Sequence, residues 1–247
     1  MSLRRLLLHL MVVLVLTAMV TAGFWQLHRL NEHRSQNALV AGRSQLAPVD
    51  VDDLLLTGQT FDEARNLEYN TVLAQGFFQA AQEVLIRNRT YQGSPGFWVL
   101  TPLRLDSGAL VAVNRGWIPF GVGTGDLLVD YAPPTHLVKV TGLLRATVTA
   151  SGLQQADPSD EVLSEMARPD LARLSHQLDA DLLPAYIQMQ SQSPPLVGEL
   201  PIPVPSLELS DGSHLAYAVQ WFLFAVVTAV GYGVVLYRLG RPGDPLG

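Results

Sequence analysis

Two apolar stretches decide the fold class of this 247-residue chain: LLLHLMVVLVLTAMVTAGF at residues 6–24 and YAVQWFLFAVVTAVGYGVVLY at residues 217–237. An α-helix rises about 1.5 Å per residue, so each stretch can cross the roughly 30 Å hydrocarbon core of a lipid bilayer. The sequence therefore predicts two transmembrane helices, at residues 6–24 and, including an outer interfacial turn, at residues 214–237.

Basic residues predict how these helices are oriented. Those that flank the apolar stretches on the terminal side are Arg4, Arg5, Arg238 and Arg241. Cytoplasmic flanks carry an excess of Lys and Arg. We therefore expect residues 1–5 and 238–247 in the cytoplasm and residues 25–213 outside it.

The first helix leaves an alternative open. Arg29, Arg34 and Arg43 follow it and favour the opposite orientation, so the second helix carries the prediction. A cleaved signal peptide ending near residues 21–23 would also explain a basic start and an apolar run. Residues 24–26, Phe-Trp-Gln, are more typical of an interfacial anchor than of a cleavage site.

The central segment, residues 25–213, is acidic and suits one domain. It holds 21 acids and 12 bases, a formal charge of −9, which argues against nucleic acid as a partner. The chain has no cysteine, so disulfides, thiol redox chemistry and thiolate delivery of copper are excluded.

Runs of β-branched and aromatic residues predict strands in this segment. They are Val84–Arg89, Phe97–Leu105, Ala109–Arg115, Val138–Leu144 and Tyr186–Gln190. Short Gly-containing turns separate the first three, which we expect to be antiparallel neighbours. Leucines at helical spacing behind Pro169 predict a helix over Asp170–Leu183. The expected fold is an α+β domain, a small antiparallel sheet or partial barrel plus a helix, flanked by the two transmembrane helices.

The remaining stretches are expected to be less regular. We expect a juxtamembrane segment over residues 31–66, with a short turn and helix in Pro48–Leu56, and an exposed acidic loop over Ala150–Glu165. Five prolines in Ser193–Pro205 predict an extended strut. The glycines at 121, 123 and 125 are interpreted as a plain turn, because Asp126 replaces the third glycine of a dinucleotide motif.

A histidine and aromatic residues meet at the predicted outer membrane boundary. At about 100° per residue, Tyr217 lies about 60° and Trp221 about 20° from His214 around the helix, so the three form one stripe. An aromatic belt that anchors the helix explains them. A site for a flat amphipathic ring explains them too, because haem iron accepts imidazole as an axial ligand.

Further polar residues leave other interpretations open. Gln26 and Gln220 are expected to bond to each other or to the domain, and His9 is interpreted as reaching water on the cytoplasmic side. A structural network, an anion-facing surface or a partner-docking patch would explain a group on adjacent predicted strands: Arg87, Arg89, Asn114, Arg115 and Trp117. No nucleophile, base and orienting group appear at the spacing of a known catalytic motif.

Three blocks of the sequence resemble the surfeit-locus (Shy) family of cytochrome c oxidase assembly factors. They are Gly23, Trp25, Gln26 and Arg29; then Asn88, Arg89, Gly96, Thr101, Pro102, Leu103, Asn114, Arg115, Gly116 and Trp117; then His214 to Phe222. With the two terminal helices, the resemblance covers essentially the whole chain. A lysine often found after the first block is absent, which weakens any role for that juxtamembrane turn.

The resemblance implies a non-catalytic, multi-pass protein of the bacterial cell membrane. It implies that haem a is held and its insertion into oxidase subunit I assisted, with the lipid bilayer, subunit I and possible haem a synthesis enzymes as partners. Carried over, His214 is the candidate axial ligand, and Tyr217, Trp221, Trp25 and Gln26 shape the pocket. An accessory protein of a respiratory complex that binds no haem is the alternative, and a membrane-anchored enzyme a more distant one.

Overall fold

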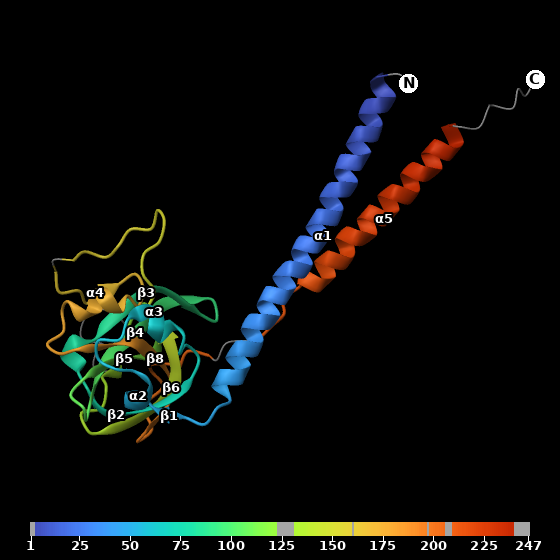
Figure 1. The fold of residues 1–247 in the computed structure, drawn as a ribbon. Coiled ribbons are helices and arrows are strands. Elements are labelled where there is room, and N and C mark those ends of the chain that lie inside the picture. The colour runs from blue at the N-terminus through green and yellow to red at the C-terminus, as the bar shows by residue number, and fades with distance from the viewer. Residues whose placement is uncertain (1–2, 123–130, 160, 197, 206–208, 240–247) are drawn as a thin grey trace, which may run out of the picture. The chain divides into compact units, whose positions relative to one another are not determined.

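The computed structural model describes residues 3–122, 131–159, 161–196, 198–205 and 209–239, which form two compact units (Figure 1). The helical unit comprises Met1–Ala41 and Glu208–Gly247, and the sheet domain comprises Gly42–Leu207. The predicted fold class is confirmed, because two helices long and apolar enough to cross a membrane flank a sheet-rich domain.

The helical unit is built from α1 (Leu3–Ser44) and α5 (His214–Leu239). Figure 1 shows α1 running alongside α5 and continuing past the first turn of α5. The prediction that the first helix ends at Phe24 is wrong, since α1 continues to Ser44. Glu32 pairs with Arg29 at 2.8 Å and His28 at 3.3 Å, and such contacts three and four residues apart stabilise helices. The limits of the membrane-crossing part stay a prediction.

Short elements lead from α1 into the sheet domain. β1 (Val49–Asp50) and α2 (Val51–Leu54) confirm the expected short helix, and Asp50 caps α2 by accepting a hydrogen bond from Asp52 N. A capping box of Thr60 and Glu63 starts α3 (Phe61–Arg65). Both helices add buried residues to the domain core, Val51 from α2 and Ala64 from α3.

All five predicted strands are present, and each is longer than expected. In chain order the strands after β1 are β2 (Thr71–Phe78), β3 (Val84–Tyr91), β4 (Ser94–Leu105), β5 (Leu110–Pro119), β6 (Val138–Ala146), β7 (Glu165–Met166) and β8 (Leu182–Ser193). A 3-10 turn, Ala80–Gln82, joins β2 to β3. Sequence reasoning missed β2, whose run TVLAQGFF mixes glutamine and glycine into the apolar pattern.

The sheet closes on itself. Its strand order is β1-β2-β6-β8-β5-β4-β3-β7, and an additional pairing of β2 with β4 joins the ring β2-β6-β8-β5-β4 into a small barrel. Gly76 lies at this seam, where an added Cβ would sit 2.0 Å from the carbonyl oxygen of Arg104, so only glycine allows the strands to approach.

The barrel is mixed rather than antiparallel throughout. The expected antiparallel pairing of β3 with β4 and β4 with β5 is confirmed. The pairs β1–β2, β3–β7 and β5–β8 are parallel, so of the two expected forms, a small antiparallel sheet or a partial barrel, it is the barrel that forms. Parallel pairing follows from the long connections between these strands, because a tight turn can only reverse the chain.

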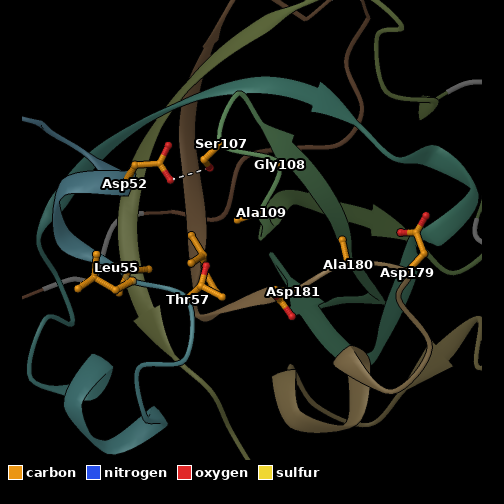
Figure 2. A pocket seen from close by; sticks show the side chains of 11 residues that line it. Asp52, Leu55, Thr57, Ser107, Gly108, Ala109, Asp179, Ala180 and Asp181 are labelled. Atoms are coloured by element: carbon orange, nitrogen blue, oxygen red, sulfur yellow. Dashed lines mark hydrogen bonds between the residues drawn. The ribbon is translucent and has the colours of Figure 1, made fainter.

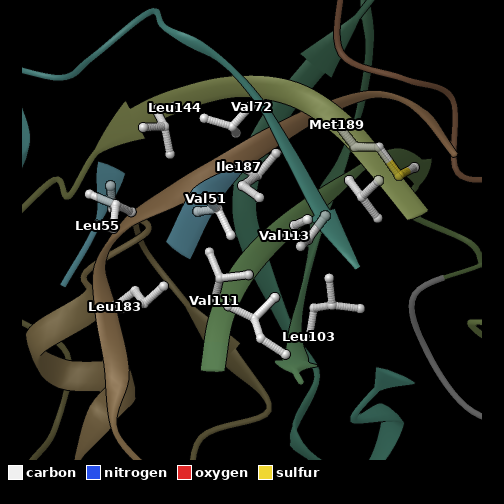
Figure 3. Packing of buried hydrophobic residues seen from close by; sticks show 14 of the residues in the cluster. Val51, Leu55, Val72, Leu103, Val111, Val113, Leu144, Leu183, Ile187 and Met189 are labelled. Carbon is white, nitrogen blue, oxygen red and sulfur yellow. The ribbon is translucent and has the colours of Figure 1, made fainter. Parts of the chain in front are cut away.

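Apolar side chains fill the barrel interior (Figure 3). Figure 3 shows residues from several strands and from α2 turned toward one another, including Val51, Val72, Leu103, Val113 and Ile187. A second cluster under α4 (Leu171–Ser175) packs Ile86, Leu100, Leu171 and Leu174. Burying these side chains is the main source of domain stability.

The helix predicted over Asp170–Leu183 is largely wrong. Only α4 forms, capped by Asp170, and Leu182 already begins β8, where it pairs with β5. Leu178 and Leu182 still pack against the second cluster, so the leucine spacing reflected burial rather than a continuous helix.

Two loops gain contacts that their sequences do not indicate. The acidic loop is mostly exposed, but the side chain of Asp157 is only 6% exposed and accepts a hydrogen bond from Ala167 N at 2.9 Å. The proline-rich strut pairs with β5, because Ile202 and Trp117 exchange backbone hydrogen bonds of 2.7 and 2.8 Å. Gly123 and Gly125 of the expected turn lie outside the described residues.

Candidate functional site

The two long helices of the helical unit contact each other at several separate points. At the first turn of α5 His214 meets Gln26, and about two turns further along α5 the ring of Phe222 packs on Phe24, with centroids 5.4 Å apart at 77°. An added Cβ at Gly23 would lie 2.6 Å from the Phe222 ring, so the absence of a side chain there lets the helices approach.

His214 begins α5 and has two neighbours on α1. Its Nδ1 lies 2.8 Å from Oε1 of Gln26. The ring of His33 stacks on its face, with centroids 4.9 Å apart and 29° between the planes. Within the part of the chain that the structure describes, Nε2 of His214 has no hydrogen-bond partner. One nitrogen of the imidazole is thus held, and the other is free to bind a ligand.

The turns of α1 that follow Gln26 also contact the residues that lead into α5. Arg34 pairs with Asp211 at 2.9 Å, and Asn37 donates to the carbonyl of Ser210 at 3.1 Å. Sequence reasoning missed this group because it ended the first helix before them. Gln26, Leu30, His33 and Asn37 recur every three to four residues, a signal that a longer helix would have revealed.

The other predicted residues of the helix site are less enclosed. Trp25 and Tyr217 are 56% and 49% exposed, and Gln220 is exposed. Trp221 is half-buried and meets Phe224 edge to face, with centroids 6.2 Å apart. The structure therefore brings Gln26 to His214, and the expected pairing of Gln26 with Gln220 is wrong because His214 takes that place.

A second polar contact lies at the other end of the helix pair. His9 Nδ1 and the hydroxyl of Tyr232 are hydrogen-bonded, and the two rings meet edge to face with centroids 5.8 Å apart. His9 thus has a partner on α5 that the sequence analysis did not assign, and the contact joins the helices.

A buried ion pair lies at the centre of the polar network of the sheet domain. Arg115 is fully buried and donates from Nη1 to Glu83 at 3.0 Å and from Nη2 to the carbonyl of Tyr131 at 2.7 Å. Thr101 also donates to Glu83, at 2.5 Å. Burial raises the pKa of the Glu83 carboxyl although Arg115 opposes it, and burial lowers the pKa of Arg115 although Glu83 opposes it.

The remaining predicted arginines tie neighbouring segments to the barrel. Arg87 pairs with the loop residue Asp157 at 2.8 Å, and the guanidinium of Arg89 lies 4.4 Å from the centre of the Trp98 ring. Trp117 donates from Nε1 to the carbonyl of Arg89 at 3.1 Å, and Asn114 accepts from Gly116 N at 3.1 Å. These contacts are internal to the domain and hold β3, β4, β5 and the acidic loop together.

An open cavity of about 750 Å³ lies at one end of the sheet domain (Figure 2). Its charged lining residues are Asp52, Asp179 and Asp181, and Figure 2 shows the 3.0 Å hydrogen bond between Ser107 and Asp52. An acidic lining repels an anionic ligand. This cavity is therefore a poor place for a molecule that carries carboxylates.

The fold and the helix contacts define a class of protein in which two membrane-length helices carry one small barrel domain. The SURF1 family matches residues 13–226, and the chain belongs to this family, whose members are known as cytochrome oxidase assembly factors. The recognition made from the three sequence blocks is confirmed.

Curated relatives cover nearly the whole chain. An uncharacterized SURF1-like protein of Mycobacterium tuberculosis is 26% identical over 235 residues, which span 90% of this chain and 81% of the relative. A SURF1-like protein of Rickettsia felis is 24% identical over 234 residues, spanning 93% and 96%. One of Rickettsia bellii is 27% identical over 236 residues, spanning 92% and 88%.

Proposed function

We propose that this protein holds haem a on its helical unit and assists its insertion into subunit I of a haem-copper cytochrome c oxidase. Membership of a family of oxidase assembly factors supports the general role. The observation that carries the specific role is His214, whose Nδ1 is engaged by Gln26 while its Nε2 has no partner among the described residues.

The residues around His214 fit a haem group. Haem iron accepts a neutral imidazole nitrogen as axial ligand, and Nε2 of His214 is such a donor. The half-buried ring of Trp221 and the apolar surface of α5 suit the macrocycle and its isoprenoid tail. The indole N–H of Trp25, next to Gln26 on α1, can donate to a propionate.

The sheet domain supports the role in another way. The cavity around Asp52, Asp179 and Asp181 disfavours the propionates of haem, so it is a poorer place for the cargo than the helical unit. We propose that the domain lies outside the cytoplasm of a bacterial cell, as the basic termini predict, and that it meets subunit I or the haem a synthesis enzymes. The protein itself is proposed to be non-catalytic.

A carrier must release its cargo, so we expect modest haem affinity. The test is the reduced-minus-oxidised spectrum of the detergent-purified protein, produced together with haem a synthesis enzymes. The wild type should show a haem a signal that His214→Ala loses. His28→Ala is the matched control, because His28 is on the same helix unit with its side chain 72% exposed, and it should keep the signal.

A wild type that carries no haem would overturn the proposed role and favour an accessory protein whose helices pack on a respiratory complex. Haem bound equally by the wild type and His214→Ala would instead remove His214 as the ligand.

A further inference from the structure

We infer that Gln26 is a positioning residue that fixes His214 in the tautomer with its proton on Nδ1, so that Nε2 faces outward as the ligand atom. The tautomer follows from the contacts of the helical unit alone. Its use in ligand binding rests on the proposed function.

The atom of Gln26 that faces His214 indicates which side donates this hydrogen bond. Oε1 of Gln26 is an amide oxygen, which accepts hydrogen bonds and cannot donate them. With this oxygen 2.8 Å from Nδ1 of His214, the contact is a hydrogen bond when Nδ1 carries the proton, and we assign the tautomer on that basis. A neutral imidazole has a single N–H, so Nε2 keeps its lone pair.

The α1 side of this hydrogen bond is held in place by packing. Gln26 lies between Gly23, which is buried under the Phe222 ring, and Leu30, whose side chain is 3% exposed. Both neighbours are about one turn away on the same helix. The amide of Gln26 is therefore presented from a fixed part of the helix rather than from a loop.

The α5 side is held as well. The pairs Arg34–Asp211 and Asn37–Ser210 tie the residues just before α5 to α1, and His33 stacks on the face of the His214 ring. These contacts leave the imidazole plane little freedom to tilt away from Gln26.

The opposite edge of the imidazole is kept open by a glycine. An added Cβ at Gly212 would lie 3.3 Å from Cδ2 and 3.5 Å from Nε2 of His214, so a side chain there would stand beside the free nitrogen. Gly212 also has a φ of +66°, a conformation that favours glycine. Gly212 thus allows both the turn that leads into α5 and access to Nε2 of His214.

Hydrogen bonds of this kind are known to tune metal ligands. A partner on the second imidazole nitrogen sets the tautomer and raises the basicity of the ligating nitrogen, and its loss costs about 10- to 100-fold in metal affinity. Gln26 would thus act on haem through His214 and not by contact.

The test uses the full-length protein in detergent without haem, labelled with ¹⁵N-histidine. Protonated and unprotonated ring nitrogens have well-separated ¹⁵N chemical shifts, and the His214 signals are identified by their absence in His214→Ala. We expect Nδ1 protonated and Nε2 unprotonated in the wild type and in Gln26→Glu, which keeps an acceptor. Gln26→Leu should move the population toward the Nε2–H form, whereas Gln36→Leu, at an exposed site on the same helix, should not.

An Nε2–H tautomer in the wild type would overturn the inference, as would an unchanged tautomer in Gln26→Leu. Because this measurement needs no haem, it separates the two claims. A wild type with the Nδ1–H tautomer that never binds haem would leave the positioning role standing and remove the proposed function. If haem binds, Gln26→Leu should weaken retention about 10- to 100-fold, and Gln26→Glu should restore retention and lower the reduction potential.

Discussion

Arg115 and Glu83 form an ion pair inside the sheet domain, with Nη1 of the arginine 3.0 Å from the carboxylate and the arginine side chain fully buried. It links β5 to the turn that precedes β3, far apart in sequence. Buried charges are costly when unpaired, so each residue depends on the other.

Replacing Arg115 by methionine should destabilise the domain by about 3–5 kcal/mol, because Glu83 is left as an uncompensated buried charge. Urea unfolding of the full-length protein in detergent, followed by tryptophan fluorescence, measures this loss. The control is Arg104→Met, which breaks the more exposed Arg104–Asp179 pair and should cost about 1 kcal/mol or less. Equal losses in the two variants would contradict the structural role of Arg115.

The Tyr131→Phe variant should fold. At alkaline pH its unfolding free energy should change less with pH than that of the wild type. The Tyr131 hydroxyl is buried without a hydrogen-bond partner in the described part of the chain, and burial, reinforced by Glu83, raises its pKa from 10.0 to about 12. The folded protein therefore holds this proton more tightly than the unfolded chain. The resulting stability is complete below pH 10.0 and is lost as the pH rises toward about 12.

Unfolding of the wild type and Tyr131→Phe at a series of alkaline pH values measures this effect. As the pH rises, the unfolding free energy of the wild type should fall relative to that of Tyr131→Phe. Tyr91→Phe, at a half-buried position, reports the effect of losing any one phenol. A wild type and Tyr131→Phe that lose stability in parallel would refute the raised pKa.

Gly23→Val should separate the two long helices, because its side chain would overlap the Phe222 ring. Gly231→Val on α5 is the matched control, since an added Cβ there meets no atom within 4 Å. The chain has no cysteine, so Met19→Cys with Thr228→Cys gives a clean cross-linking pair at a contact between the helices. We expect slower cross-linking with Gly23→Val and an unchanged rate with Gly231→Val; the reverse order would contradict the packing.

Trp221→Ala should reduce haem retention, because Trp221 lies on the same face of α5 as His214. Membrane insertion should stay intact, because the apolar length of the helix is unchanged. Haem per protein after purification measures the first effect, and resistance to alkaline extraction measures the second. Val227→Ala, at a 62% exposed position on the same helix, should change neither. Unchanged haem content in Trp221→Ala would remove this residue from the site.

Local patterns in the sequence were enough to predict the two apolar helices and five of the strands. Apolar length and alternation are properties of short windows, so Leu6–Phe24 and Phe97–Leu105 could be interpreted without knowing their neighbours. The family blocks likewise pointed to His214 and Gln26 as members of one site.

Contacts between distant residues could not be predicted in this way. The closure of β2 on β4 at Gly76 depends on the register of two strands, and the Arg115–Glu83 pair depends on the barrel that results. The leucines after Pro169 led to a wrong prediction. They have the spacing of a helix and pack against the second cluster, but the chain is helical only over Leu171–Ser175.

By itself the sequence determined that this protein has two membrane-length helices around one strand-rich domain, and that a histidine opens the second helix. Only the tertiary structure decided that α1 continues beyond the apolar stretch and brings Gln26 and His33 to His214. The physical reason is that hydrophobic periodicity depends only on residues close together in the sequence. The hydrogen bond that selects an imidazole tautomer depends on two helices packed at a particular register.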